Sequence, residues 1–220
     1  MRKRENRRLW AGVLWLALFA VWTWLVQTID VHPAGETGTP VGFATVNCWF
    51  HTLTGVHMKL YAVTDWLGLV PVGVCLLFAG VGLAQLLQRK RLWKVDWDLL
   101  FLGCQYVLVV IGYLVFERSP INYRPILIGG YQEISYPSST TLLVLSVMPT
   151  LILQANRRMK KENWKKVITF LTNSFSAFMV MGRLISGVHW LTDIVGSVFL
   201  SVGLFCLYQG LVLRYCNPKK

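Results

Sequence analysis

The chain has 220 residues, of which 55% are apolar and 15% charged, and its net charge is +12. With Gly included, the apolar share reaches about 63%, against about 45–50% in an ordinary soluble domain. Soluble enzymes, disulfide-stapled secreted domains and disordered tails are thereby excluded. Together with a mean hydropathy of +0.50, the composition indicates a polytopic membrane protein.

Six apolar stretches are long enough to cross a bilayer core of about 30 Å, which takes roughly 20 helical residues. The predicted spans are 9–27, 66–88, 98–116, 138–156, 167–185 and 191–213. The first follows a basic start, as in a signal peptide, but its apolar run is too long, and we expect a retained anchor. We therefore predict an all-α fold, a six-transmembrane helical bundle forming a single domain over residues 1–220.

The distribution of Lys and Arg predicts the orientation of this bundle. Eighteen of the 22 basic residues lie at the N-terminus, in the 89–97 and 157–166 loops and at the C-terminus. Because positive charge stays in the cytoplasm, both termini are expected inside. The basic excess is then a signal for topology that also attracts anionic membrane lipids, and no nucleic-acid partner is expected.

Three segments are left for the outer face, namely 28–65, 117–137 and a tight turn near 185–190. The first is too long for a simple connector. Its middle, from Val41 to Tyr61, mixes aromatic residues with His51, His57 and Lys59. This mixture indicates an interfacial or re-entrant helix over the outer mouth of the bundle.

The turn before the last span carries the first candidate for chemistry. His189 and Asp193 are four residues apart, the spacing that puts two side chains on one helix face. A carboxylate there can fix the imidazole tautomer and leave the other ring nitrogen as a nucleophile or base. Arg183 lies across a turn eased by Gly187, and its guanidinium suits an anionic substrate such as a phosphate. The same His–Asp pair would also serve merely to cap and pack a helix start.

Two further polar groups precede predicted spans on the same outer face. Pro137 with Ser138, Ser139 and Thr140 opens the fourth span, where free backbone N–H groups and hydroxyls favour an anion or form a simple N-cap. Arg118 and Arg124 lie in or next to the loop before it. All three groups are expected to lie together at the outer end of the bundle, between spans three to six.

This pattern resembles the type-2 phosphatidic-acid phosphatase family, relatives of vanadium haloperoxidases. That family shows Lys-x6-Arg-Pro, then Pro-Ser-Gly-His, then Ser-Arg-x5-His-x3-Asp. Arg124-Pro125 matches the end of the first motif and Pro137-Ser138 the start of the second. Arg183, His189 and Asp193 match the third motif at full spacing.

The resemblance implies a phosphomonoester or diphosphate hydrolase that acts on a lipid. His189 and Asp193 would be catalytic, with His189 forming a phosphohistidine and Asp193 orienting it. The substrate phosphate would be held by residues of all three motifs, namely Arg183, Arg124, Ser138, Ser139, Thr140 and Arg118.

Four positions depart from the family pattern. Glu117 stands in place of Lys, Ser139 in place of Gly, and Gly182 in place of Ser. Thr140 replaces the second His, which is the general acid for the leaving group, and a hydroxyl cannot replace imidazole in that role near neutral pH. Because a leaving phosphate has a second pKa of about 6 and needs no such acid, a polyprenyl or other lipid diphosphate is favoured. Alternatively, His51 or His57 from the outer loop supplies the acid.

Two other functions remain open. A protein with this fold could bind lipid phosphate without turning it over, as the missing acid and Glu117 suggest. A lipid phosphotransferase would pass the phosphoryl group to an alcohol instead of water. A transporter is disfavoured, because no predicted span holds an internal charge pair.

No metal site or other cofactor is expected, because the four His are dispersed and the five Cys are scattered without a CxxC spacing. The expected partners are a phosphorylated lipid substrate and membrane lipids; the oligomeric state does not follow from the sequence. The expected location is a bacterial cell membrane, with the active site facing outward.

Overall fold

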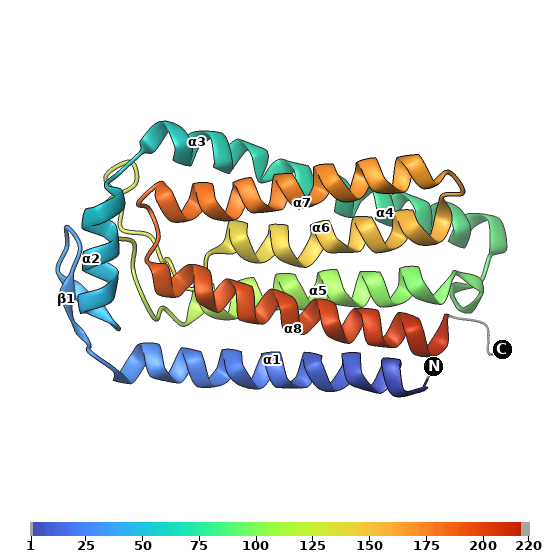
Figure 1. Ribbon diagram of the computed structural model, residues 1–220, viewed down its shortest axis with the longest axis horizontal. Coiled ribbons are helices and arrows are strands. Elements are labelled where there is room, and N and C mark those ends of the chain that lie inside the picture. Colours follow the sequence, from blue (N-terminus) through green and yellow to red (C-terminus); the bar gives the residue numbers. More distant parts are fainter. Residues whose placement is uncertain (1, 217–220) are drawn as a thin grey trace.

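The computed structural model describes residues 2–216, whose long helices run side by side in one bundle (Figure 1). Six helical segments among those residues are long and apolar enough to cross a membrane. They are α1 (Arg2–Thr28), the pair α3 (Met58–Leu67) and α4 (Leu69–Arg89), α5 (Trp97–Arg118), α6 (Ser139–Arg158), α7 (Glu162–Ile185) and α8 (Leu191–Tyr215). The predicted all-α, six-span class is confirmed, and the chain is an integral multi-pass membrane protein.

Three of the helices begin five residues or more before the predicted span. The helix of the first span begins at Arg2 rather than at residue 9, that of the second at Met58 rather than 66, and that of the fifth at Glu162 rather than 167. An apolar run marks the part of a helix that needs hydrocarbon around it, whereas the backbone hydrogen bonds of the helix continue into its polar flanks. The other limits differ by two residues at most.

The second span is built from two helices that meet at Gly68. The backbone N–H of Gly68 donates to the carbonyl oxygens of Thr64 and Asp65, at 3.1 and 3.0 Å. The sequence analysis assigned residues 58–65 to the outer segment 28–65. They instead form the first turns of the span, and α3 packs against α7.

The connection from α1 to α3 spans residues 29–57 instead of 28–65. Strands β1 (His32–Ala34) and β2 (Thr39–Val41), which the sequence analysis did not predict, pair antiparallel with His32 opposite Val41. Helix α2 (Ala44–Thr54) follows and lies across the end of the bundle (Figure 1). The helix predicted between Val41 and Tyr61 is therefore shorter than predicted, and the rest of that stretch begins α3.

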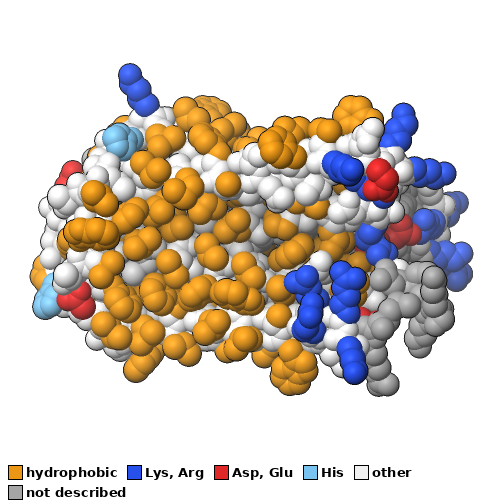
Figure 2. All heavy atoms as spheres, viewed as in Figure 1, with side chains coloured by type: hydrophobic (Ala, Val, Ile, Leu, Met, Phe, Trp, Pro, Cys, Tyr) orange, Lys and Arg blue, Asp and Glu red, His pale blue; other side chains and the backbone are white. Residues whose placement is uncertain are grey.

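The two ends of the bundle differ in charge. Figure 2 shows Lys and Arg side chains gathered at the end where α1 begins and α8 ends, here called the basic end. The hairpin, α2, the 119–138 loop and the α7–α8 turn lie at the opposite end, here called the loop end. Apolar side chains cover the surface between them. The cytoplasmic position of the basic end stays a prediction, and Lys219 and Lys220, which the sequence analysis counted with the C-terminal basic residues, lie outside the described residues.

Ion pairs join the helices at the basic end. The buried carboxylate of Asp98 on α5 lies 3.2 Å from Nε of Arg157 and 3.0 Å from Nη2 of Arg158, both at the end of α6. Arg158 also reaches Asp96 at 3.3 Å, and Arg89 of α4 lies 2.8 Å from the same residue. The turn that holds η1 (Leu92–Lys94) is thus fixed between α4, α5 and α6.

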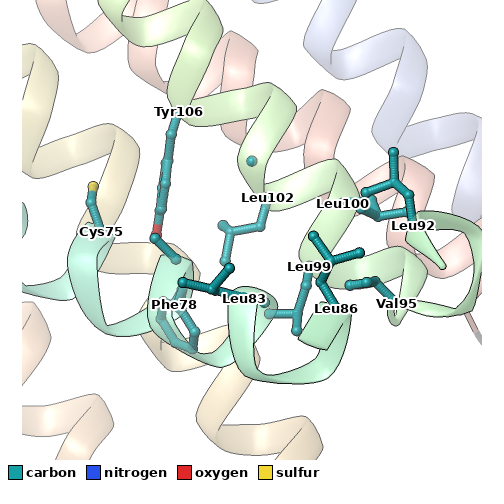
Figure 3. Close-up of a pocket in the computed structure, with 13 residues that line it drawn as sticks. Cys75, Phe78, Leu83, Leu86, Leu92, Val95, Leu99, Leu100, Leu102 and Tyr106 are labelled. Atoms are coloured by element: carbon teal, nitrogen blue, oxygen red, sulfur yellow. The ribbon is translucent and has the colours of Figure 1, made fainter. Parts of the chain in front are cut away.

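An apolar pocket of about 300 Å³ lies between α4 and α5 (Figure 3). Phe78, Leu83 and Leu86 of α4 face Leu99 and Leu102 of α5 across it. No charged side chain lines this pocket, and its walls are almost entirely apolar.

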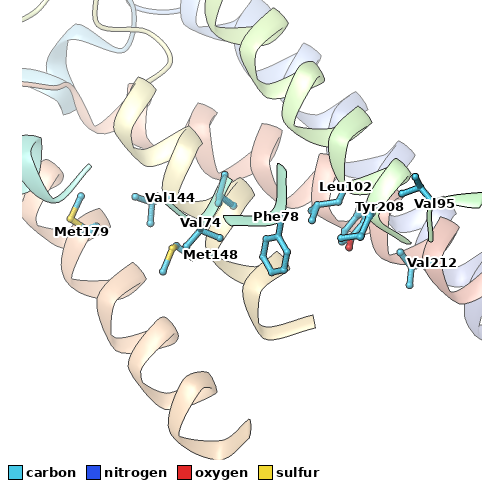
Figure 4. Close-up of a cluster of buried hydrophobic side chains, with 11 residues drawn as sticks. Val74, Phe78, Val95, Leu102, Val144, Met148, Met179, Tyr208 and Val212 are labelled. Atoms are coloured by element: carbon cyan, nitrogen blue, oxygen red, sulfur yellow. The ribbon is translucent and has the colours of Figure 1, made fainter. Parts of the chain in front are cut away.

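The main apolar core draws side chains from five helices (Figure 4). They include Val74 and Phe78 of α4, Leu102 of α5, Val144 and Met148 of α6, Met179 of α7, and Tyr208 and Val212 of α8. Of the six spans, α6 and α8 are the most buried. Their first turns are tied together by Ser197, whose hydroxyl donates to the Ser138 carbonyl at 3.0 Å. This tie brings the starts of both helices to one place at the loop end.

Candidate active site

The His189–Asp193 pair is built by the turn between α7 and α8. Gly187 has φ +71°, and a Cβ there would lie 2.1 Å from the carbonyl oxygen of Gly55, so only glycine fits this turn. Since α8 begins at Leu191, His189 precedes the helix, and the expectation that it shares a helix face with Asp193 is wrong. The turn nevertheless brings Nδ1 of His189 to 3.7 Å from Oδ2 of Asp193.

The Asp193 carboxylate is held by two donors. Its Oδ2 accepts a hydrogen bond from the backbone N–H of Trp190 at 2.9 Å, which also caps the start of α8. Its Oδ1 accepts one from Nδ2 of Asn122 at 3.2 Å. The carboxylate is fully buried, so these donors fix its direction toward the imidazole.

His189 is buried and chemically available. Its side chain is 1% exposed, and neither ring nitrogen has a hydrogen-bond partner among the described residues. Burial holds the pKa of its imidazole well below the ordinary value of 6.5, and the positive charges of Arg124 and Arg183 lower it further. The ring is therefore neutral at pH 7, the form in which a nitrogen lone pair can attack.

Two arginines face the same region. Arg183 of α7 is 1% exposed, and Nη1 lies 3.5 Å from Oδ1 of Asp65. Arg124, from the 119–138 loop, is also buried, and its Nε lies 3.0 Å from Oε2 of Glu133. Both guanidinium groups lie over the ring of Tyr61, at 4.8 and 5.7 Å from its centre. Nε of Arg183 and Nη1 of Arg124 have no acceptor in the described chain, so both can bind an anion.

The predicted serine and threonine group divides into three roles. Ser138 is buried and caps α6, and its backbone N–H is directed at the Asp193 carbonyl, 3.4 Å away. Ser139 lines a small cavity that also contains His189. Thr140 lines the neighbouring cavity of about 380 Å³, whose walls include Asp65 and Ser139. Ser138 therefore supports the site, while Ser139 and Thr140 face space that a ligand can fill.

Arg118 is not brought to the site. It is exposed at the end of α5, and it lines neither the small cavity with His189 nor the cavity beside Thr140. Glu117, its neighbour, lines the small cavity with His189 instead. The two loop histidines are held by backbone oxygens: Nε2 of His51 lies 3.1 Å from the Gly187 carbonyl, and Nε2 of His57 lies 2.9 Å from that of Thr54.

Three residues at the site were missed by the sequence analysis. Asn122 holds Asp193, while Tyr61 and Asp65 contact Arg183. The spacing of four between Tyr61 and Asp65 was a usable signal, because it puts both on one face of any helix. Asn122 gave no signal beyond its position two residues before Arg124.

No cluster of three or more His, Cys, Asp or Glu side chains that could hold a metal ion occurs in the described part of the chain. The five cysteines, all within that part, are free. The chemistry that this arrangement supports is nucleophilic attack by a neutral imidazole on an anion held by two arginines.

The fold and the site together define a class of protein. It is a multi-pass α-helical membrane protein with a buried His–Asp pair beside two arginines. The chain belongs to the PAP2 superfamily, whose sequence model matches residues 77–214. The family inferred from the three motifs is thereby confirmed.

The fold is similar to that in a crystal structure of the first transmembrane PAP2 type phosphatidylglycerolphosphate phosphatase from Bacillus subtilis. The TM-score is 0.57 at 18% identity, over 94% of this chain and 98% of that chain. A search of curated proteins gives no match.

Proposed function

We propose that this protein is a lipid phosphatase that works through a phosphohistidine at His189. The observation that carries the proposal is the buried imidazole of His189 beside the Asp193 carboxylate and two arginines with free N–H groups. Membership of the PAP2 superfamily and the likeness to a phosphatidylglycerolphosphate phosphatase support the same reaction class.

The reaction has two halves. In the first, a His189 nitrogen attacks phosphorus, the bond from phosphorus to the leaving oxygen breaks, and Asp193 stabilises the imidazolium-like product. Arg124 and Arg183 bind the phosphoryl oxygens, which is the main contribution proteins make to phosphoryl transfer. In the second half, water attacks phosphorus, the phosphorus–nitrogen bond breaks, and inorganic phosphate leaves.

The favoured substrate is a lipid diphosphate, with a polyprenyl diphosphate as the leading case. Thr140 cannot protonate a leaving alkoxide, whereas a leaving phosphate needs no proton. The cavity beside Thr140 is walled mainly by apolar side chains, among them Leu69, Val109 and Leu143, which suit the hydrocarbon tail of a lipid. The proposed setting is a bacterial cell membrane with the loop end outward.

The test is phosphate release by detergent-purified protein offered a polyprenyl diphosphate and phosphatidic acid in parallel. We expect the diphosphate to be preferred by about 10²-fold in kcat/KM, the lower end of what a general acid contributes. His189→Ala should lower turnover by about 10³-fold or more. The matched control is His32→Ala, since that imidazole is exposed at the same end of the bundle and pairs with the Asp30 carboxylate at 3.3 Å.

The second candidate is a protein that binds lipid phosphate without hydrolysing it. Glu117 favours it, because a carboxylate lines the cavity of His189 where a lysine would attract phosphate. Folded protein that binds both lipids and releases no phosphate would establish this alternative. Phosphoryl transfer to an added alcohol, without hydrolysis, would establish a transferase.

A further inference from the structure

Asp65 lies on α3, in a part of the chain that precedes the region matched by the PAP2 sequence model. One face of α3 carries Tyr61, Thr64 and Asp65, and all three contact or closely approach α7. Tyr61 lies under the Arg183 guanidinium, and Asp65 lies 3.5 Å from its Nη1. A helix outside the three recognised motifs therefore contributes directly to the surroundings of a motif residue.

The close approach of α3 to α7 depends on Gly182. A Cβ at this position would lie 2.6 Å from Cγ2 of Thr64, well inside the contact distance of about 3.5–4.0 Å between carbon atoms. The family has Ser at this position. The loss of that side chain is what lets Thr64 reach the backbone of α7, and Asp65 is the next residue along α3.

Asp65 also shares a cavity with Thr140, which stands in the place of the missing histidine. Ser139 and Tyr113 line both this cavity and the smaller one that contains His189, so the two cavities adjoin. The Asp65 side chain is 57% exposed and can exchange protons with solvent. A carboxylate oxygen in this position can accept a proton from water.

Replacement of the second histidine by Thr140 affects the two halves of the proposed reaction differently. A lipid phosphate leaves without a proton, so the first half tolerates the replacement. Hydrolysis of the phosphohistidine still requires a group to orient the attacking water and take its proton. The chain must therefore offer a base from somewhere other than position 140.

We propose that Asp65 is this base and thus a further catalytic residue; the inference rests on the proposed phosphatase function. As the water oxygen bonds to phosphorus, the phosphorus–nitrogen bond breaks and its electron pair returns to His189. The water proton passes to the Asp65 carboxylate, which later releases it to solvent. Asp65 and Gly182 together compensate for the loss of the histidine at position 140.

The first experiment separates the two halves of the reaction in Asp65→Asn, which keeps the size of the side chain and an oxygen for Arg183. We expect steady-state turnover of the diphosphate to fall by about 10²-fold, as loss of a general base does. The first-turnover burst of lipid monophosphate should remain, and the phosphohistidine should accumulate. Glu36→Gln is the matched control, because this exposed carboxylate at the same end bonds only to the Leu127 backbone.

The second experiment restores a base at the family position. In the Asp65→Asn background, Thr140→His should recover turnover by about tenfold or more, whereas Thr140→Asn, which adds bulk without a base, should not. A residue that merely positions Arg183 would not be rescued from position 140. The cavity beside Thr140 leaves room for the larger side chains.

The outcomes separate this inference from the function on which it rests. If the unaltered protein hydrolyses no lipid phosphate, both fail. A second case is that the unaltered protein is active and His189→Ala is not. If Asp65→Asn then turns over normally, or loses the burst, only the role of Asp65 is refuted and the proposed function stands. If phosphohistidine accumulates in Glu117→Gln and not in Asp65→Asn, the base is Glu117. That result would also overturn the proposed role of Asp65.

Discussion

The packing of α3 on α7 makes Gly182→Ala the most informative single substitution. The added Cβ would lie 2.6 Å from Cγ2 of Thr64, so the two groups must separate by about 1 Å. Thr64 cannot simply rotate, because it is fully buried, its χ1 is stiff, and its hydroxyl donates to the carbonyl oxygens of Leu60 and Tyr61. Helix α3 must therefore move, and Tyr61 and Asp65 move with it.

The cost follows from two opposing effects. Overpacking a tight contact destabilises by about 1–3 kcal/mol, and replacing Gly by Ala within a helix stabilises by about 1 kcal/mol. The net loss for Gly182→Ala is thus about 0–2 kcal/mol. The effect on activity is larger, because the 3.5 Å contact between Asp65 and Arg183 would open by about 1 Å, a displacement that can lower turnover by about 10²-fold.

A second variant isolates the contact. Thr64→Ser removes Cγ2 and keeps the hydroxyl, at a cost of about 0.5–1.5 kcal/mol for one buried methyl. In that background Gly182→Ala should be neutral or stabilising and should leave most of the activity intact. The coupling free energy between the two substitutions should be about 1 kcal/mol or more in favour of the double variant.

The assay is unfolding in mixed detergent for the unaltered protein, both single variants and the double variant, with turnover of the diphosphate measured on each. Additive effects, within about 0.5 kcal/mol, would refute the close contact as the cause. Unchanged turnover in Gly182→Ala would refute the claim that α3 positions catalytic groups.

Three other predictions follow from the site and the basic end. Because burial and two arginines lower the pKa of His189, single-turnover phosphohistidine formation should persist well below pH 6.5, and half-loss at 6.5 would contradict this. Asp193→Asn should lower turnover and should lower the free energy of unfolding by about 1–3 kcal/mol. The amide NH₂ of Asn would replace a carboxylate oxygen that accepts from the Trp190 N–H or from Asn122, so two donors would face each other. Equal melting temperatures of the two proteins would refute this prediction. Asp98→Asn should cost a similar amount in stability through Arg157 and Arg158 while kcat stays unchanged, and a parallel loss of kcat would show that the basic end acts on the site.

The sequence predicted best what lies close together along the chain. Arg183 at the end of α7, His189 in the following turn and Asp193 at the start of α8 are close in sequence, so one tight connection brings them near each other. Arg124 was placed on the same outer face from its position in the loop before the fourth span, and the family resemblance then gave it a phosphate-binding role.

What the sequence missed depends on tertiary packing. Asp65 and Tyr61 lie more than 100 residues from Arg183, and their stretch was assigned to a loop because hydropathy detects hydrocarbon exposure, not helix formation. The β1–β2 hairpin is too short to give an alternating pattern. Arg118 was grouped with Arg124 because both are basic residues at the outer ends of predicted spans, and its exposure at the end of α5 does not support a shared role.

The ion pairs at the basic end and the chemistry at the loop end are separated by nearly the whole length of α8. From Asp193 to Tyr215 that helix rises about 33 Å, roughly the thickness of the hydrocarbon layer. Sites so far apart contribute to stability independently. The two ends can therefore be engineered separately. Substitutions around Asp98 can improve detergent tolerance and expression without changing catalysis. Inactive variants of the loop end should still purify as folded protein.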